Sequence, residues 1–315
     1  MTPWVHLESR GVIAISGSER IDFLQGLSTQ KITEQGAVFS AILLPNGRFF
    51  TDFFALNTKD TLLIDCAKEH HEALLNLLRP YGSLHGVQLM DASNQFAICA
   101  ALGTLAHTVC APLVTHLEHD QGTSQGTGQK KMRFYTDPRH PDLGLRAFVP
   151  HVLWNELPHP MMDPSPESLY HKTRMALGIP EGVYDLVHQQ SIILEYGYHH
   201  MNALDWNKGC YMGQELMART FHRGHIRKHL YRMTLASGTF PAKGSVLYHT
   251  PDQNPDHTPD EASQSQRMGY MGGHYDRHGL ATLHEQLYDG GTHTLFLATD
   301  DVTADPFSVF LEPCF

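Results

Sequence analysis

The sequence predicts an α+β fold with a small β-barrel in its C-terminal part. In the first part of the chain, short apolar strand-like runs alternate irregularly with helical segments and a hairpin, which favours α+β over a doubly wound parallel sheet. After about residue 230, short strand-like runs follow one another without a helical period, as in a small barrel or sandwich. We therefore expect an α+β region at 1–229 and a β-barrel domain at 230–315.

The N-terminal elements are predicted from local patterns. The β-branched run at 11–16 predicts a strand. Ser16 and Glu19 have the spacing of a capping box and predict a helix through residues 21–27. Two apolar runs within 41–56, joined by a Pro-Asn-Gly turn at 45–47, predict a hairpin.

Further strands and a helix follow the hairpin. A strand is expected at 61–66, and two more at 87–93 and 95–103. Between them, the spacing of Ala73, Leu74, Leu77 and Leu78 predicts a helix over 68–82. We expect this helix to end at Pro80 and Gly82, the two helix-breaking residues near its end.

Two more helices are predicted before the barrel. The first covers 169–176 and stops at Gly178 and Pro180. The second covers 214–224, where Leu216, Met217 and Thr220 can share an apolar face. Three polar or proline-rich stretches are predicted surface loops, namely 118–131, 157–168 and 250–267.

Composition excludes several classes of protein. A formal net charge of −10 argues against general binding to nucleic acid or to anionic membrane surfaces. No apolar run approaches the roughly 20 residues that span a bilayer, and the N-terminal residues lack a signal-peptide pattern. Five widely separated cysteines without a CxxC pair fit reduced thiols in the cytoplasm, so we expect a cytoplasmic protein.

The 23 histidines invite a metal-site interpretation, for example with His199, His200, Cys210 and His222 as ligands. However, the histidines are spread along the whole chain and form no HExxH motif. The interpretation we favour is therefore that there is no metal site.

The most informative segment is Lys-Gly-Cys-Tyr-Met-Gly-Gln-Glu at 208–215. It places Cys210 beside Lys208 and ahead of a predicted helix, and a nearby cation and a helix N-terminus both favour the reactive thiolate. Gly209 and Gly213 allow a tight backbone path or close approach of a ligand. The alternative is that Cys210 is a small buried hydrophobic residue, and chemistry alone leaves both interpretations open.

This octapeptide resembles the signature of the YgfZ family, folate-binding proteins that assist iron–sulfur cluster assembly and are related to the glycine-cleavage T-protein. Other segments match the family in the same order along the whole chain. These are the opening strand and helix, the hairpin, the segment 137–146, the Gly-Ile-Pro-Glu-Gly run at 178–182, Glu195, and the late Gly269 and 279–283.

The resemblance implies a T-protein-like multi-part body around a central folate-sized opening, with the barrel packed against it. It assigns the functional thiol to Cys210, with Lys208 favouring its thiolate form. It assigns pterin binding to Glu195, because a carboxylate can accept two parallel hydrogen bonds from the N–H groups of the pterin edge. The remaining expected ligand-binding residues are Gly209, Tyr211, Gly213, Gln214, Glu215, Arg219 and Arg223. Arg219, Arg223 or Arg227 is a candidate to receive the glutamate tail.

Three departures from the family pattern concern the ligand. Gly197 stands where the family commonly has Asn, and His199 where it often has Asp. The segment 81–84 replaces an arginine-rich one. The pterin contact is therefore better supported than the tail contact.

The implied function is a tetrahydrofolate-binding factor for assembly or repair of iron–sulfur clusters in client proteins. The alternative is a folate-dependent aminomethyltransferase or demethylase. Such an enzyme needs a carboxylate for acid–base chemistry at the folate, and T-proteins have an acidic residue where this chain has Cys210. The cysteine therefore weighs against the enzyme.

Overall fold

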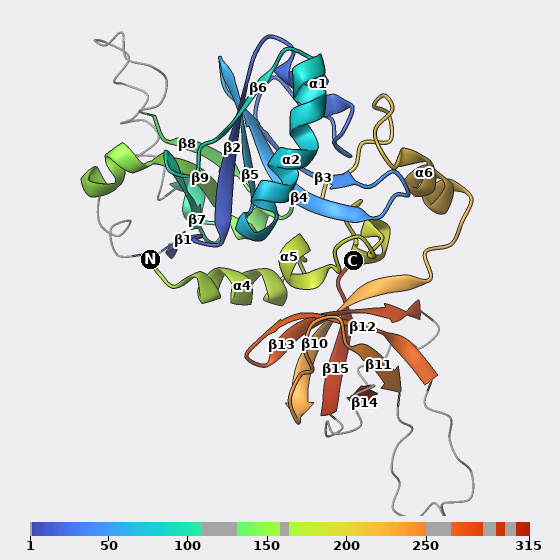
Figure 1. Ribbon diagram of the computed structural model, residues 1–315. Helices are drawn as coiled ribbons and strands as arrows, with labels where there is room; N and C mark the ends of the chain where they lie inside the picture. The colour runs from blue at the N-terminus through green and yellow to red at the C-terminus, as the bar shows by residue number, and fades with distance from the viewer. Residues whose placement is uncertain (1, 109–130, 158–163, 250–265, 286–293, 300–306) are drawn as a thin grey trace, which may run out of the picture.

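The computed structural model describes residues 2–108, 131–157, 164–249, 266–285, 294–299 and 307–315. These residues form an α+β body of two sheets with helices, and a β-barrel that lies below the body in Figure 1. The predicted fold class is confirmed. No helix of the described ranges is long and apolar enough to cross a membrane.

The first sheet is antiparallel and has five strands. Their order is β3 (Ala37–Leu43), β4 (Phe49–Asn57), β5 (Thr61–Ala67), β2 (Arg10–Ser16) and β6 (Gln88–Asp91). The strands predicted at 11–16 and 61–66 and the hairpin are therefore confirmed. Gly47 adopts a φ of 76° in the hairpin turn, a conformation that glycine reaches without strain.

Two helices cover one face of this sheet, α1 (Arg20–Gln25) and α2 (Lys68–Leu84). Side chains on that face of the sheet, such as Ile13 and Ile15, form one apolar cluster with Leu74 and Leu78 of α2. The opposite side chains of β2, Val12 and Ala14, belong to a different cluster, because successive strand residues point to opposite faces.

The predicted capping box is wrong. Ser16 is the last residue of β2 and pairs with Thr61 and Gln88, so it stays in the sheet. Gly17, with a φ of 122°, then turns the chain, and α1 starts only at Arg20. Glu19 is the N-cap, and no side chain caps this helix.

The predicted end of the next helix is also wrong, because α2 continues through Pro80 to Leu84. Pro80 lies on the exposed side of α2, where its missing N–H faces solvent rather than the core. The buried face of α2 includes Leu74, Leu75 and Leu78, whereas Ala73 is exposed.

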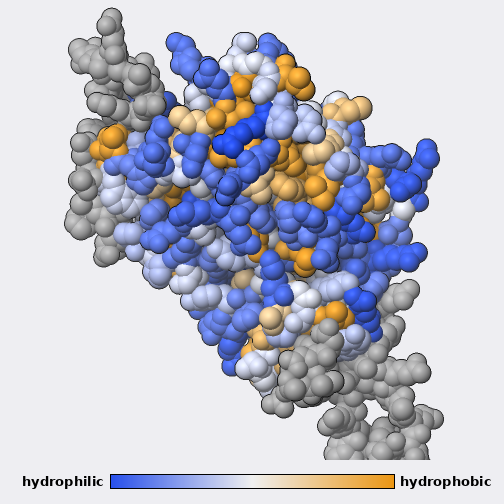
Figure 2. Space-filling model, viewed as in Figure 1, coloured by the Kyte–Doolittle hydropathy of each residue, from blue (hydrophilic) through white to orange (hydrophobic). Residues whose placement is uncertain are grey.

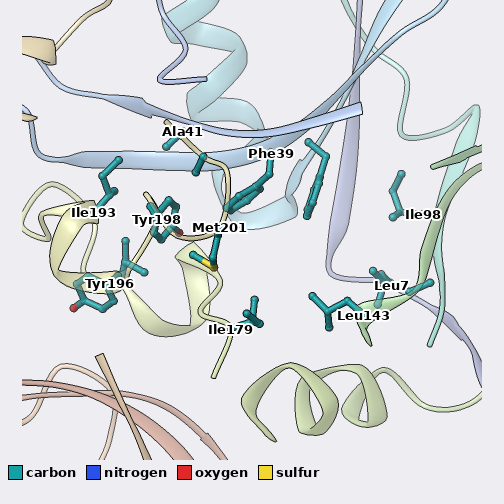
Figure 3. Packing of buried hydrophobic residues seen from close by; sticks show 14 of the residues in the cluster. Leu7, Phe39, Ala41, Ile98, Leu143, Ile179, Ile193, Tyr196, Tyr198 and Met201 are labelled. Atoms are coloured by element: carbon teal, nitrogen blue, oxygen red, sulfur yellow. The ribbon is translucent and has the colours of Figure 1, made fainter. Parts of the chain in front are cut away.

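The second sheet has four strands and faces the side of the first sheet that α1 and α2 leave open. Its order is β1 (Trp4–His6), β7 (Phe96–Ala101), β9 (Leu145–Pro150) and β8 (Arg133–Thr136). The largest apolar cluster lies here, where residues as distant in sequence as Leu7, Phe39, Ile98 and Tyr198 pack together (Figure 3).

The helices α4 (Glu167–Ala176) and α5 (Gly182–Asp185) lie between the sheets and the barrel (Figure 1). The helix predicted at 169–176 is thereby confirmed. A 3-10 helix at Ile193–Tyr196 and α6 (Gln214–His222) follow, and two further 3-10 helices cover Pro141–Leu143 and His151–Glu156.

A buried network of charged side chains joins the two sheets. Asp65 of β5 accepts hydrogen bonds of 2.6 Å from Arg10 of β2 and 2.6 Å from Arg146 of β9. Glu181, just before α5, accepts a hydrogen bond of 2.9 Å from Arg10 and one of 2.6 Å from the hydroxyl of Tyr170 in α4.

Arg139, which comes from the same segment 137–146 as Arg146, extends this network. Arg139 donates to Asp137 at 2.7 Å and to the hydroxyl of Tyr170 at 2.8 Å. Three buried arginines thus meet three buried carboxylates, those of Asp65, Asp137 and Glu181. This balance matters because a buried charge is tolerated only when it is paired and hydrogen-bonded.

The barrel is closed and antiparallel. Its order is β10 (Lys228–Ser237), β13 (His278–His284), β12 (Gln266–Tyr275), β11 (Val246–His249), β14 (Thr294–Thr299) and β15 (Phe307–Pro313). Tyr231 and Met233 of β10 belong to the barrel's own core, whereas Leu230 and Leu280 belong to the core of the body.

A further ion pair fastens the barrel to the body. Arg174 of α4 donates to Asp185 at 2.6 Å, and the other oxygen of Asp185 accepts the backbone N–H of Gly273 in β12 at 2.9 Å. Leu230 and Leu280 add apolar contact across the same boundary. The barrel is therefore held by both polar and apolar contacts.

Most of the predicted loops fall outside the described residues. This holds for nearly all of 118–131 and 250–267, and for residues 158–163 of the loop predicted at 157–168. The end of the loop at 157–168 is structured, because Ser165 forms a β-bridge with Val5 and α4 begins at Glu167.

The pKa of Glu181 predicts how stability depends on pH. Burial alone would raise this pKa, but Arg10, Arg139 and Arg174 outweigh burial and hold it well below its usual range. The ionised carboxylate therefore stabilises the fold fully above the ordinary pKa of 4.5, and this stabilisation is lost as pH falls through the lower folded-state pKa.

Glu181→Gln should lower the free energy of unfolding at neutral pH by about 3–5 kcal/mol, because it leaves the three arginines of the network with only two carboxylates, so that one buried positive charge is uncompensated. Urea unfolding at a series of pH values measures this. The difference from wild type should shrink as the pH falls below 4.5. Glu72→Gln, an exposed position on α2, is the matched control. An equal difference at all pH values would contradict the role of the Glu181 charge.

Candidate functional site

The segment 208–215 forms a loop that leads into α6. Gly213 is the N-cap of α6 and has a φ of 81°. A Cβ atom at this position would lie 2.7 Å from the carbonyl oxygen of Leu44, so a larger residue would clash with the hairpin turn. Leu216 of α6 also packs against the hairpin turn, where it contacts Gly47. Glycine is therefore required at Gly213 both by conformation and by space.

The side chain of Lys208 anchors this loop. Its ammonium donates to the backbone oxygens of Ser28 at 2.6 Å, Gln25 at 2.9 Å and Gln30 at 3.1 Å. Burial lowers the pKa of Lys208 to about 8, so the ammonium is still mostly charged at neutral pH. The backbone N–H of Met212 adds a hydrogen bond to Gly26. Lys208 thus binds the turn after α1.

Cys210 is exposed. The other cysteines within the described ranges differ, since Cys66 and Cys99 are buried and Cys314 is largely covered. Burial raises the pKa of each of these three thiols to about 12. The interpretation of Cys210 as a buried packing residue is therefore wrong. An exposed thiol can meet a second molecule.

The neighbours of Cys210 have different surroundings. Tyr211 is buried under Lys208, whose Nζ lies 5.4 Å from the centre of its ring, and burial raises the pKa of Tyr211 to about 12. The ideal Cβ of Gly209 meets no atom within 4 Å, so this position faces open space. Glu215, Arg219 and Arg223 are exposed on or just beyond α6, and Gln214 is partly exposed.

Glu195 lies in a different place, in a cavity of about 540 Å³ between the hairpin turn, the segment 187–196 and the barrel. Burial raises the pKa of its carboxyl group, although Lys228 and Arg48 act in the opposite direction. Lys228 lies 3.8 Å from its Oε1. Hydrophilic side chains dominate the surface where body and barrel meet, and apolar patches lie mainly over the upper body (Figure 2).

The structure does not bring the predicted site residues together in this cavity. Among the described residues that line it, none comes from 208–215, and neither Arg219 nor Arg223 contributes. Sequence reasoning instead missed Arg48, directly after the hairpin turn, and Tyr270 of β12. Lys228, the last basic residue of the run that begins at Arg219, also lines the cavity. The only sequence signal for Arg48 was its position directly after the predicted hairpin turn at 45–47.

The four hypothetical metal ligands do not form a cluster. Within the described part of the chain, no group of three or more His, Cys, Asp and Glu side chains could hold a metal ion. The rings of His199 and His200 instead contact each other in a tilted arrangement, with 4.0 Å between their centres, and His222 meets Trp206 edge to face.

Comparison with solved structures settles the fold. The crystal structure of glycine cleavage system aminomethyltransferase T from Bartonella henselae matches 98% of this chain and 84% of its own, with a TM-score of 0.70 and 10% identity. The fold is that of the T-protein. At this identity, the match establishes the architecture alone.

No protein-family model matches the chain. Its sequence is similar to proteins named iron–sulfur cluster assembly factor IBA57, mitochondrial, or its homologues. Identity is 26% over 264 residues with the protein of Dictyostelium discoideum and 29% over 267 residues with that of Mus musculus. These matches cover 74% and 76% of this chain, and 62% and 67% of the relatives.

The anchor at Lys208 predicts a local effect on the loop. Lys208→Met should accelerate hydrogen exchange of the Met212 amide by about tenfold or more, because three backbone oxygens lose a charged donor. Mass spectrometry or NMR of exchange measures this. Lys172→Met, which removes an exposed lysine of α4, is the control and should leave exchange at Met212 unchanged. Wild-type exchange in Lys208→Met would contradict the anchoring role.

Proposed function

We propose that this chain is an iron–sulfur cluster assembly factor that presents Cys210 to a partner protein and binds a reduced folate at Glu195. The observation that carries the proposal is the exposure of Cys210 on an anchored loop. The similarity to proteins named iron–sulfur cluster assembly factors supports the same role. The resemblance of residues 208–215 to the YgfZ signature supports it as well.

A cluster would be handled as cargo rather than as a resident cofactor. Cluster-binding proteins generally hold iron through several cysteine thiolates, so one thiol at Cys210 is insufficient. The other described cysteines are covered. The missing ligands would therefore come from a partner that docks over Cys210. The exposed ring of Phe221 on α6, stacked on Trp206 at 4.3 Å, supplies apolar area for such a contact.

The Glu195 cavity suits a folate in size and in chemistry. Its volume of about 540 Å³ lies in the range of about 300–1,000 Å³ that is usual for small-molecule sites. The Glu195 carboxylate would accept the paired N–H groups of the pterin edge. Arg48 and Lys228 line the same cavity and would attract the carboxylates of the tail. Arg219, on α6, and Arg223, just beyond its end, do not line the described wall of this cavity, so Arg48 and Lys228 are better placed for the tail.

The position of the thiol favours an assembly factor over an aminomethyltransferase. Cys210 does not line the described wall of the Glu195 cavity, so chemistry on a folate bound there would not involve its sulfur. The thiol is instead available to a macromolecule. The cytoplasmic location stays a prediction from the cysteine pattern.

Cys210→Ala should abolish the ability of the chain to restore iron–sulfur enzyme activity in a strain that lacks it. The reason is that the partner would lose the one exposed thiol that the described part of this chain offers. Aconitase or succinate dehydrogenase activity in extracts is the measurement. Cys314→Ala, which removes a largely covered thiol, is the control and should complement like wild type. Full complementation by Cys210→Ala would contradict a functional thiol.

Glu195→Gln should weaken binding of 5-formyltetrahydrofolate by about tenfold or more, because a charge-assisted hydrogen-bond pair is lost. Calorimetry measures this, with exposed Glu285→Gln as the control. Acidification should weaken wild-type binding as the Glu195 carboxylate becomes protonated. This loss should begin at a higher pH than for an ordinary glutamate, since burial raises this pKa. Binding by Glu195→Gln that equals wild type would contradict the assignment.

A further inference from the structure

A second cavity, of about 360 Å³, lies between the two sheets of the body. Its floor is a row of three side chains on adjacent strands, because Ala14 of β2 pairs with Leu63 of β5 on one side and with Met90 of β6 on the other. Phe96 of β7 contributes the wall from the second sheet. This part of the cavity is therefore apolar, whereas its other described lining residues are polar or charged.

The cavity follows from a small residue at a core position. Val12 and Ala14 of β2 point to the same side, toward the second sheet. Ala14 lies between the larger Leu63 and Met90 in the row, and its single methyl group leaves space that a leucine would fill. Met90 is 46% exposed, so the cavity reaches the surface and a ligand can enter it.

Cationic side chains surround this apolar part. Arg133 of β8 lies two residues before Tyr135, whose ring packs between the sheets, and so it points to the same side of its strand. Lys59, in the turn between β4 and β5, and Lys131 line the cavity as well, against a single carboxylate, that of Asp60. This local excess of positive charge contrasts with the net charge of −10 of the chain.

The guanidinium of Arg133 has no hydrogen-bond or ion-pair partner among the residues that the structure describes. It is partly buried, and burial lowers its pKa. The buried arginines of the network between the sheets are all paired with carboxylates. A partly buried cation without a counterion is well placed to bind an anionic group that enters the cavity.

We propose that this cavity binds a small amphiphilic anion, with its apolar part on Ala14, Leu63 and Phe96 and its carboxylate or phosphate group at Arg133. The volume lies near the lower end of the usual range for ligand sites, which matches a short chain or a single ring. Lys59 and Lys131 add to the attraction for the anionic group. The described lining residues of this cavity and of the Glu195 cavity are entirely different, so the two sites are distinct.

The test is titration calorimetry of the full chain with three probes. Octanoate offers both an apolar chain and a carboxylate, octanol offers only the chain, and inorganic phosphate offers only the charge. Arg133→Gln removes the cation with little change in size. Arg79→Gln is the matched control, because Arg79 is exposed on α2, on the opposite face of the same sheet. Ala14→Leu fills the floor of the cavity.

Octanoate should bind wild type and Arg79→Gln equally, and Arg133→Gln at least about tenfold more weakly, as expected for a lost charge-assisted bond. Octanol and phosphate should each bind more weakly than octanoate, and Ala14→Leu should also weaken octanoate. No octanoate binding, or equal binding by Arg133→Gln, would overturn the proposal. Phosphate that binds as tightly as octanoate would overturn it too, since the apolar part would then contribute nothing.

Discussion

The arrangement of the body depends on the buried ion pairs around Arg10, Asp65 and Glu181. Arg10 of the first sheet binds Asp65 beside it and Glu181 next to α5, and Asp65 also binds Arg146 of the second sheet. Removing one partner would leave a charge buried without compensation, which costs far more than an exposed pair contributes. These contacts therefore fix how the two sheets, α4 and α5 sit together, and Asp185 extends the constraint to the barrel.

This frame holds two chemically different places apart. The hairpin turn lies between them, because Gly47 packs against Leu216 of α6 while Arg48 lines the Glu195 cavity. On one side, Lys208 fixes a loop with an exposed thiol. On the other, a carboxylate and two cations line a cavity between the body and the barrel. The proposed folate binding and the proposed partner contact would therefore use separate surfaces.

Local sequence signals predicted the elements and much less of their contacts. The hairpin, the strand at 61–66 and the helix at 169–176 follow from turn residues and apolar periods, which act over a few residues. The capping box failed because pairing with β5 and β6 keeps Ser16 in its strand. The pairs Arg10–Asp65 and Arg10–Glu181 span 55 and 171 residues, and no local pattern encodes them. The motif identified Cys210, whereas its exposure and its separation from the described wall of the Glu195 cavity required the structure.

The most direct test of this account is alkylation of the intact chain by iodoacetamide, followed for each cysteine by mass spectrometry, with and without saturating 5-formyltetrahydrofolate. Cys210 should react well before Cys66 and Cys99, and the folate should leave its rate of alkylation unchanged. Protection of Cys210 by the folate would place the thiol in the ligand cavity. Reaction as slow as that of the buried thiols would show that Cys210 is not presented to a partner, and either result would contradict the account.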